Sequence, residues 1–362
     1  MKLYYISCRN SWGSGIQNKI NNQLLYFTKV GLKTDYINIQ FNKNNLIRLI
    51  MPFVSMYNYR NLDKIEKNSI CFFRYNGIDL NGILYLRKLR KKNVRIYIEI
   101  PTYPYDNEMK KKKLFYKDKI MRNFLYRYVD KVFTYSNDKY IFRIPCINIS
   151  NFVDCNKILP RANKSNNNEV NIIAVATLAF WHGYDRAIKG LHNYYLNTNN
   201  KVIVKLHFVG DGPILDDYKK MVKEYHLEKY VVFYGAKKGV ELSNIYDICD
   251  IALDSLGRHR SGIFYNSSLK GKEYMAKGLP IISGVATELD SIDNYLYYLR
   301  VPADDSPLDI NEICLFYEKV YGNQSKKEVI KSISSKAKEM FNIDIAMQPI
   351  IEELKSIDFN TK

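Results

Sequence analysis

The sequence is poor in the residues that build metal centres and disulfide frameworks. Its 362 residues include five histidines and six cysteines, with no Cys-x-x-Cys pair and no histidines at metal-ligand spacing. We therefore expect no metal site and no resident cofactor. The thiols are expected to stay reduced, as they do in the cytoplasm.

Long hydrophobic runs are missing too. No stretch approaches the roughly 20 consecutive apolar residues that span a bilayer. The chain enters a strand-like run at residues 2–8 directly, without the charged and apolar leader of an exported protein. The sequence therefore predicts a cytoplasmic protein that is not integral to a membrane.

Negative charge is scarce, with 37 acidic against 55 basic residues and a net charge of +18. Such an excess implies an anionic partner. The sequence has no zinc finger, RNP-like motif or disordered basic tail, so nucleic acid is not the expected partner. Much of the excess lies in residues 109–131, where basic side chains alternate with aromatic and aliphatic ones. This mixture suits an anionic membrane surface, with residues 47–56 as a second apolar contact, and it suits a solvated helix packed by one face equally well.

Short apolar runs alternate with helical periodicity almost throughout the chain. This alternation predicts an α/β protein with parallel sheets and crossover helices. A polar stretch at residues 159–169 interrupts the pattern as a linker would, and the alternation then restarts. The expected strands are 2–8, 34–39, 70–75, 95–100 and 131–135 before the linker, and 170–176, 202–209, 231–234, 251–254 and 279–283 after it.

A helix is predicted over residues 269–277, because Ser268 can cap its start and Gly278 can end it. Lys270 and Lys272 fall in its first turn, where the unpaired N–H groups already carry partial positive charge. An anion bound at this end would remove the conflict.

Glu273 lies one turn further along the same predicted helix. The spacing places it on one face with Leu269 and Ala276, which is expected to point inward. A carboxylate on an inward face needs a partner, such as the hydroxyl groups of a ligand. The alternative is a solvated face carrying a Glu273–Lys277 ion pair.

The motif Lys-x-x-Glu-Tyr-Met-Ala-x-Gly-Leu-Pro at residues 270–280, followed by the apolar Ile281 and Ile282, resembles the donor-binding segment of GT-B glycosyltransferases, specifically those like family 4 (group 1). Further stretches that resemble the family are residues 132–136, 149–154, 208–213 and 231–235. The resemblance implies the GT-B fold, in which two Rossmann-like domains with parallel sheets face a central cleft.

The same resemblance implies that the two domains bind different substrates. Residues 1–155 would bind the acceptor, and residues 156–335 would bind the nucleotide-sugar donor. A C-terminal helix at residues 340–358 is expected to cross back onto the first domain.

The resemblance also implies roles for residues of the donor site, which would take a UDP- or GDP-sugar. The carboxylate of Glu273 would bind the ribose, and the helix start at Ser268, Leu269 and Lys270 would face the diphosphate. Gly15, in the first strand-to-helix loop, would lie beside the transferred sugar. The backbone of Gly235 and Ala236 would contact the base.

The sequence departs from the family pattern at two positions. Tyr265 stands where the family has a second glutamate, and His182 stands where it has a lysine before Gly183. His182 and Arg186 remain candidates for donor contacts, although packing would explain His182 equally well. The expected substitutes for the missing phosphate contact are Arg258, Arg260 and Lys270, since guanidinium groups suit phosphate oxygens.

The first half lacks the histidine that many family members place after the strand at residues 95–100. Glu99 and Asp106 are the carboxylates nearest this point, and Asp106 is preferred as a catalytic candidate because it lies in a loop. Solvation or helix capping would explain either acid as well.

The resulting prediction is a glycosyltransferase that moves a sugar onto a hydroxyl of a glycan or of a polyprenyl-diphosphate-linked glycan, in surface polysaccharide biosynthesis. The catalytic candidates are Glu273, Lys270, Arg260 and Asp106. Retention of configuration follows from the resemblance, and a metal-independent reaction is preferred because no Asp-x-Asp motif lies on a strand-to-helix loop.

Other functions remain open at this point. A GT-B nucleotide-sugar binding protein without transfer activity or a sugar-nucleotide epimerase would share the same cleft. A basic nucleic-acid-binding protein is a more distant alternative, because it leaves the restarted α/β pattern unexplained. The enzyme itself is expected in the cytoplasm or at the inner face of the cell membrane.

Overall fold

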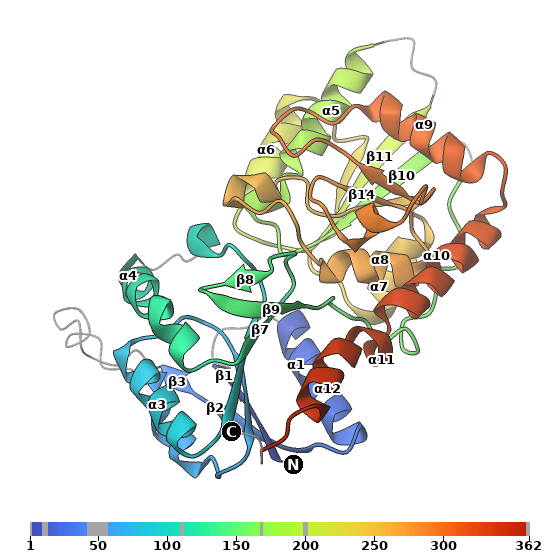
Figure 1. The fold of residues 1–362 in the computed structure, drawn as a ribbon. Coiled ribbons are helices and arrows are strands. Elements are labelled where there is room, and N and C mark those ends of the chain that lie inside the picture. Colours follow the sequence, from blue (N-terminus) through green and yellow to red (C-terminus); the bar gives the residue numbers. More distant parts are fainter. Residues whose placement is uncertain are drawn as a thin grey trace. The chain divides into compact units, whose positions relative to one another are not determined.

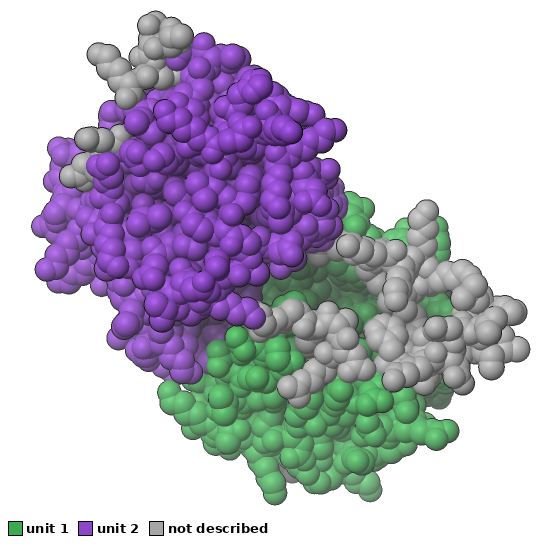
Figure 2. All heavy atoms as spheres, turned by 180° about the vertical axis from the view of Figure 1, so that it is seen from behind, with its two compact units in different colours: residues 1–149, 347–362 green, residues 150–346 purple. Residues whose placement is uncertain are grey.

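The computed structural model describes residues 2–8, 14–41, 57–108, 112–166, 169–197 and 202–359. The chain forms two compact units (Figure 1). Residues 1–149 and 347–362 make up unit 1, and residues 150–346 make up unit 2 (Figure 2). The expected apolar contact at residues 47–56 and the start of the basic segment, residues 109–111, lie outside the described residues.

Unit 1 is built on a seven-stranded sheet in the order β2-β1-β5-β6-β7-β9-β8. The pairs are parallel except that β8 runs antiparallel to β9. Each strand predicted in the first half is confirmed to within two residues. The strands are β1 (Lys2–Ser7), β2 (Lys33–Asn38), β5 (Ile70–Arg74), β6 (Arg95–Ile100), β7 (Lys131–Thr134), β8 (Tyr140–Ile141) and β9 (Ile144–Asn148), with a separate pair of β3 (Gln40–Phe41) and β4 (Tyr57–Asn58).

Aromatic rings fill the centre of unit 1. Phe72 stacks on Tyr5 at 5.3 Å and on Phe133 at 5.4 Å between ring centroids, and Phe133 stacks on Tyr97 at 5.5 Å. These residues are almost fully buried and come from four parallel strands. Because aromatic side chains bury large apolar areas, this row accounts for much of the stability of the unit. The helices of unit 1 are α1 (Ser14–Lys29), α3 (Leu80–Lys91), α4 (Lys112–Met121) and α12 (Gln348–Lys355).

Unit 2 contains a six-stranded parallel sheet in the order β12-β11-β10-β13-β14-β15. Every strand predicted in the second half is confirmed, and β15 was not predicted. The strands are β10 (Glu169–Val175), β11 (Ile203–Val209), β12 (Val231–Phe233), β13 (Ile251–Leu253), β14 (Ile281–Ser283) and β15 (Tyr298–Arg300).

The predicted helix at residues 269–277 is present as α8, with the expected cap at Ser268 and a left-handed Gly278 at its end. None of the helices in the described part of the chain combines the length and apolarity needed to cross a membrane. The helices of unit 2 are α5 (Asp185–Leu196), α6 (Leu215–Glu224), α7 (Gly239–Asp247), α8 (Leu269–Lys277), α9 (Ile310–Tyr321), α10 (Lys326–Phe341) and α11 (Ile343–Ala346).

The beginning and the end of unit 2 are neighbours in space. Val153 N donates to Phe341 O at 3.0 Å, and Val153 forms a parallel bridge with Asn342. The chain then returns to unit 1 as α12, where Glu353 accepts hydrogen bonds from Tyr97 OH at 3.0 Å and Lys131 Nζ at 2.6 Å.

At Gly210, the loop after β11 approaches the loop after β10 very closely. Its φ is +132°, and a Cβ added there would lie 1.9 Å from Ala176 O. We expect Gly210→Ala to destabilise unit 2 by about 3 kcal/mol, because both the backbone strain and the clash must be relieved. Gly239→Ala is the matched control, since its φ is +56° but no atom lies within 4 Å of the added Cβ.

The control should cost only about 1 kcal/mol, the price of a left-handed non-glycine residue. Differential scanning calorimetry of both variants measures the difference. Equal shifts in Tm would contradict the packing argument.

Candidate functional site

The carboxyl ends of β10 and β13 form the switch point of the unit 2 sheet, because the chain continues from β10 to β11 on one side and returns to β13 on the other. Open α/β sheets bind ligands at such a point. The loops that follow these strands, residues 176–184 and 254–262, touch through two glycines. A Cβ added to Gly183 would lie 2.5 Å from Gly257 N, so the close approach of the backbones requires glycine.

His182 stabilises this loop pair. Its carbonyl oxygen accepts a hydrogen bond from Leu256 N at 2.7 Å, and its Nδ1 accepts one from Ala179 N at 3.1 Å. The ring is stacked on Tyr184 with centroids 5.6 Å apart. Burial, together with the nearby charge of Lys270, lowers the pKa of His182 far below its usual range. The neutral ring therefore fixes the conformation of the loop in which a donor contact was expected.

Lys270 lies at the start of α8, directly beside the loop after β13. Ser268 caps the helix, its Oγ accepting from Gly271 N at 3.4 Å and donating to Asp254 Oδ1 at 2.8 Å. The Nζ of Lys270 is 3.6 Å from Asp254 Oδ1 and donates to Ser255 Oγ at 3.0 Å. Burial lowers the pKa of Lys270 to about 8, although Asp254 acts in the opposite direction.

The prediction that Glu273 points inward is wrong. Its side chain is exposed, and the inward charge of α8 is instead Lys272, which is 3% exposed and paired with Glu288. Met275 and Ala276 follow Lys272 by three and four residues and are buried as well. The inward face of the helix therefore runs through Lys272, one position away from the face that the apolar spacing suggested.

Glu273 forms no hydrogen bond or ion pair with any residue that the structure describes. The alternative Glu273–Lys277 pair is not formed, since Lys277 Nζ donates to Ser243 Oγ at 3.1 Å. Although the side chain is exposed, the surrounding protein removes part of the solvation of the Glu273 carboxyl and thereby raises its pKa, which the charge of Lys270 opposes. The helix therefore presents an accessible carboxylate three residues after a cation.

Arg260 is bonded within unit 2. Its Nη atoms pair with both carboxylate oxygens of Asp185 at 2.8 and 2.9 Å, and its Nε donates to Asp305 Oδ1 at 2.6 Å. Arg258 opens the same short 3-10 helix, η5 (Arg258–Ser261), and is half-buried. Arg260 thus ties the loop after β13 to the start of α5.

Arg186 is fully buried, although the sequence suggested a donor contact. Its Nη1 donates to Leu256 O at 2.6 Å, its Nε donates to Ser306 O at 2.7 Å, and its Nη2 lies 3.4 Å from Asp304. These bonds join the loop after β13 to the segment that precedes α9. The direct hydrogen bonds of Arg186 therefore hold the loops around the site in position.

Gly235 and Ala236 lie just after β12, where a base contact was expected. Gly210 N donates to Gly235 O at 2.8 Å, which fixes the loop. Gly235 has a φ of +65° with no atom within 4 Å of a Cβ built on it, and Ala236 is exposed. The backbone at this point is therefore open to a ligand.

In unit 1, Gly15 lies in the first turn of α1. Asp106 forms a bidentate pair with Arg122 at 2.6 and 3.1 Å. The hydrogen bonds from Arg122 lower the pKa of Asp106, which weakens it as a general base.

Glu99 is fully buried and accepts from Arg74 Nη1 at 2.7 Å and Gln23 Nε2 at 3.1 Å. Burial alone would raise the pKa of Glu99, but Arg74 and Lys19 lower it to about 2. Neither solvation nor capping explains this acid. Glu99 instead anchors a buried ionic network.

The structure brings Lys270, Glu273, Ser268 and Leu269 together on α8. Sequence reasoning missed Asp254 and Ser255, which contact Lys270, although polar residues directly after a buried strand were a usable signal. Within the described ranges, no group of three or more His, Cys, Asp or Glu side chains is placed to hold a metal ion.

Comparison with known proteins gives the second unit a family assignment. Residues 156–288 match the family model "Glycosyl transferases group 1". No curated protein matches the sequence.

Solved structures resemble the chain over nearly its whole length. Anabaena Alr3699/HepE in complex with UDP and glucose has a TM-score of 0.64 at 12% identity, covering 99% of this chain and 100% of its own. A glycosyltransferase from Rickettsia africae has a TM-score of 0.67 at 13% identity, covering 100% and 99%. The apo form of the lipopolysaccharide outer core galactosyltransferase WaaB has a TM-score of 0.62 at 16% identity, covering 98% and 99%.

At these identities the likeness concerns the fold, and the predicted α/β GT-B fold is confirmed. The group 1 match covers the loops after β10 and β13 and all of α8. Residues 156–288 therefore form a glycosyl transferases group 1 domain, and the protein is a glycosyltransferase with the GT-B fold.

Proposed function

We propose that this glycosyltransferase takes its sugar from a UDP- or GDP-sugar bound at the start of α8. The arrangement of Lys270 and Glu273 is the observation that carries the proposal. The ammonium of Lys270 and the unpaired N–H groups of the helix start suit a diphosphate. The accessible carboxylate of Glu273, which has no partner in the described chain, suits the hydroxyls of a ribose.

The rest of the donor site follows from the loops at the same sheet edge. The open backbone at Gly235 and Ala236 would contact the base, and Arg258 would reach the phosphates. His182, Arg186 and Arg260 would act by keeping the loops in place, because their side chains make hydrogen bonds within the protein. Anabaena HepE, which shares the fold, has been solved with UDP and glucose.

Catalysis would depend on stabilising the charge that develops on the leaving nucleoside diphosphate. Lys270 and the N-terminal end of α8 supply positive potential at this position without a metal ion. We infer a metal-independent, retaining transfer of the family 4 kind, because the motif at residues 270–280 resembles that family. Tyr265, where the family has a glutamate, would then line the sugar pocket without a charge.

We assign acceptor binding to residues 1–155 together with residues 340–358, where the structure has the end of α10, α11 and α12 in place of one predicted helix. We assign donor binding to residues 156–335. Gly15, at the start of α1, would lie beside the transferred sugar. Asp106 remains a candidate for the acceptor side, where it would have to leave Arg122 before it could accept a proton.

Unit 1 carries a surface that fits an anionic membrane. Exposed apolar and aromatic side chains lie beside cations on α4 and the following 3-10 helix. Arg127 lies 5.7 Å from the ring centroids of both Phe124 and Tyr126, and Arg143 lies 5.4 Å from that of Tyr126. This basic aromatic surface consists of Tyr116, Lys119, Ile120, Phe124, Tyr126, Arg127 and Arg143.

Such a surface supports a peripheral position at the inner face of the cell membrane, where each basic residue contributes about 1 kcal/mol. The acceptor would then be a polyprenyl-diphosphate-linked glycan in surface polysaccharide biosynthesis. The galactosyltransferase WaaB, named for the lipopolysaccharide outer core, shares the fold.

Glu273→Gln tests the ribose contact. We expect UDP or GDP affinity to fall about tenfold or more, because an ionised acceptor is replaced by a neutral amide. Glu312→Gln is the control, since Glu312 is also exposed in a helix of unit 2. Isothermal titration calorimetry measures both variants. An unchanged Kd in Glu273→Gln would refute the assignment.

The pKa of Lys270 leads us to expect that donor binding depends on pH. Because its pKa is about 8, its ammonium is present at pH 7 and is lost as the pH rises. UDP affinity should therefore fall by up to about tenfold between pH 7 and pH 9. Asp254→Asn should move this fall to lower pH, since Asp254 raises the pKa of Lys270.

Lys270→Arg is the control, because a guanidinium stays charged over the whole range. Its affinity should remain level between pH 7 and pH 9. A parallel decline in this variant would assign the pH effect to another group.

Vesicle flotation tests the basic aromatic surface. We expect Lys119→Ala/Arg127→Ala to float less with vesicles of anionic lipid than the wild type does, because both cations border the exposed rings. Lys219→Ala/Lys220→Ala removes the same charge from α6 and should float as the wild type does. Equal flotation of both double variants would count against membrane binding by this surface.

A further inference from the structure

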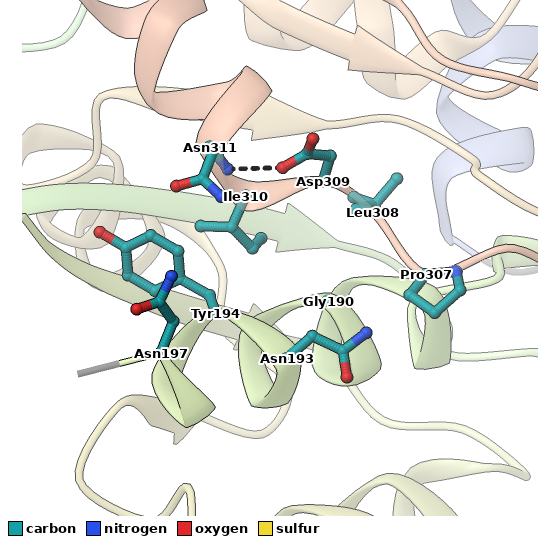
Figure 3. Close-up of a pocket in the computed structure, with 9 residues that line it drawn as sticks. All are labelled: Gly190, Asn193, Tyr194, Asn197, Pro307, Leu308, Asp309, Ile310 and Asn311. Carbon is teal, nitrogen blue, oxygen red and sulfur yellow. Dashed lines mark hydrogen bonds between the residues drawn. The ribbon is translucent and has the colours of Figure 1, made fainter. Parts of the chain in front are cut away.

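A cavity lies in unit 2 between α5 and the start of α9, apart from the proposed donor site. It has a volume of about 300 Å³ and is lined by residues of both helices and of the segment that joins β15 to α9. Figure 3 shows Tyr194 from α5, and Asn197 directly after this helix, facing Ile310 and Asn311 from α9. This volume lies within the range of small-ligand sites.

The two walls of the cavity approach each other closely at Gly190. A Cβ added to Gly190 would lie 2.2 Å from Leu308 O, so the segment before α9 rests directly on α5 at this glycine. Leu308 N also donates to Arg186 O at 3.0 Å. Further along the chain, the larger side chains of Asn193 in α5 and of Asn197 directly after it line the space instead.

The chemistry of the lining is that of a site for hydroxyl groups. Three side-chain amides, those of Asn193, Asn197 and Asn311, line the cavity, and each can both donate and accept hydrogen bonds. All three residues are exposed. Buried Leu308 and Ile310 supply an apolar floor against which the C–H face of a sugar ring can pack.

The charge of the lining argues against an anionic ligand. None of the described residues that line the cavity is a lysine or an arginine, although the chain carries a net charge of +18. The one carboxylate, Asp309, is occupied as the cap of α9, where its Oδ1 accepts from Asn311 N at 2.8 Å and Glu312 N at 3.4 Å. Among these described lining residues, a phosphate or diphosphate would find no counter-charge.

We propose that this cavity binds a neutral oligosaccharide, at a site separate from the donor site at the start of α8. The inference goes beyond the proposed transfer reaction, because it concerns a glycan that is held and not consumed at this position. A glycan bound here would raise the local concentration of the chain on which the enzyme acts.

One segment of backbone, residues 304–309, lies between the cavity and the loop after β13. Asp305 accepts from Arg260 Nε at 2.6 Å, and Ser306 O accepts from Arg186 Nε at 2.7 Å, on the side of the donor loop. Leu308 and Asp309, which follow directly, line the cavity. The segment at residues 304–309 therefore separates the cavity from the loop after β13.

Saturation-transfer NMR on the full chain tests the proposal, with maltotriose, cellotriose, laminaritriose and chitotriose as neutral probes and trigalacturonic acid as an acidic one. We expect at least one neutral probe to bind, and an excess of UDP to leave its signal unchanged. Asn193→Ala/Asn311→Ala should weaken this binding about tenfold or more, since two hydrogen-bonding groups are lost. Asn156→Ala, a change at an exposed asparagine elsewhere in unit 2, should have no effect.

UDP affinity is measured on the same samples. A loss of UDP binding at the donor site is therefore distinguished from a loss of oligosaccharide binding in this cavity. Both asparagine variants should retain wild-type UDP affinity and Tm. The proposal is overturned if none of the neutral probes binds. It is also overturned if UDP displaces the bound probe, or if the Asn193→Ala/Asn311→Ala variant binds as tightly as the wild type.

Discussion

The ion pair between Lys272 and Glu288 fixes α8 to the rest of unit 2. Their side chains are 4% and 16% exposed, and removing one partner of such a pair typically costs about 3 to 5 kcal/mol, because a charge is left without compensation. Glu288 also accepts from Ser150 Oγ at 2.7 Å, and Lys272 Nζ lies 4.3 Å from the ring centroid of Phe341. The helix of the proposed donor site is thereby joined to the first and the last segments of the unit.

The described cations around the start of α8 differ in whether their side chains are bonded within the protein or remain accessible. Arg186, Arg260 and Lys272 are bonded to protein oxygens that fix three loops. Lys270 is less buried, with a fifth of its side chain exposed, and its neighbours are mostly hydroxyl groups. The loops are therefore in position without a ligand, which reduces the ordering that binding must bring about.

Most of the strands could be predicted because they are short apolar or β-branched runs, as Val231–Phe233 and Ile251–Leu253 illustrate. The bounds of α8 could also be predicted from the local sequence, because Ser268 can cap the start of the helix and Gly278 can end it. The inward face of α8 could not be predicted, because Lys272 is buried only through its pairing with Glu288, sixteen residues away in the sequence. The structural roles of Arg186 and Glu99 could not be predicted for the same reason, because their bonding partners also lie far away in the sequence.

The bridge between Val153 and Asn342 has a consequence for the architecture of the chain. Because the first and last segments of unit 2 are adjacent, the unit is an insertion into unit 1 whose two connections leave from one place. Domains with adjacent ends tolerate transplantation between chains. Exchanging a single contiguous block of sequence between related enzymes would therefore replace the whole of unit 2, and with it the proposed donor site.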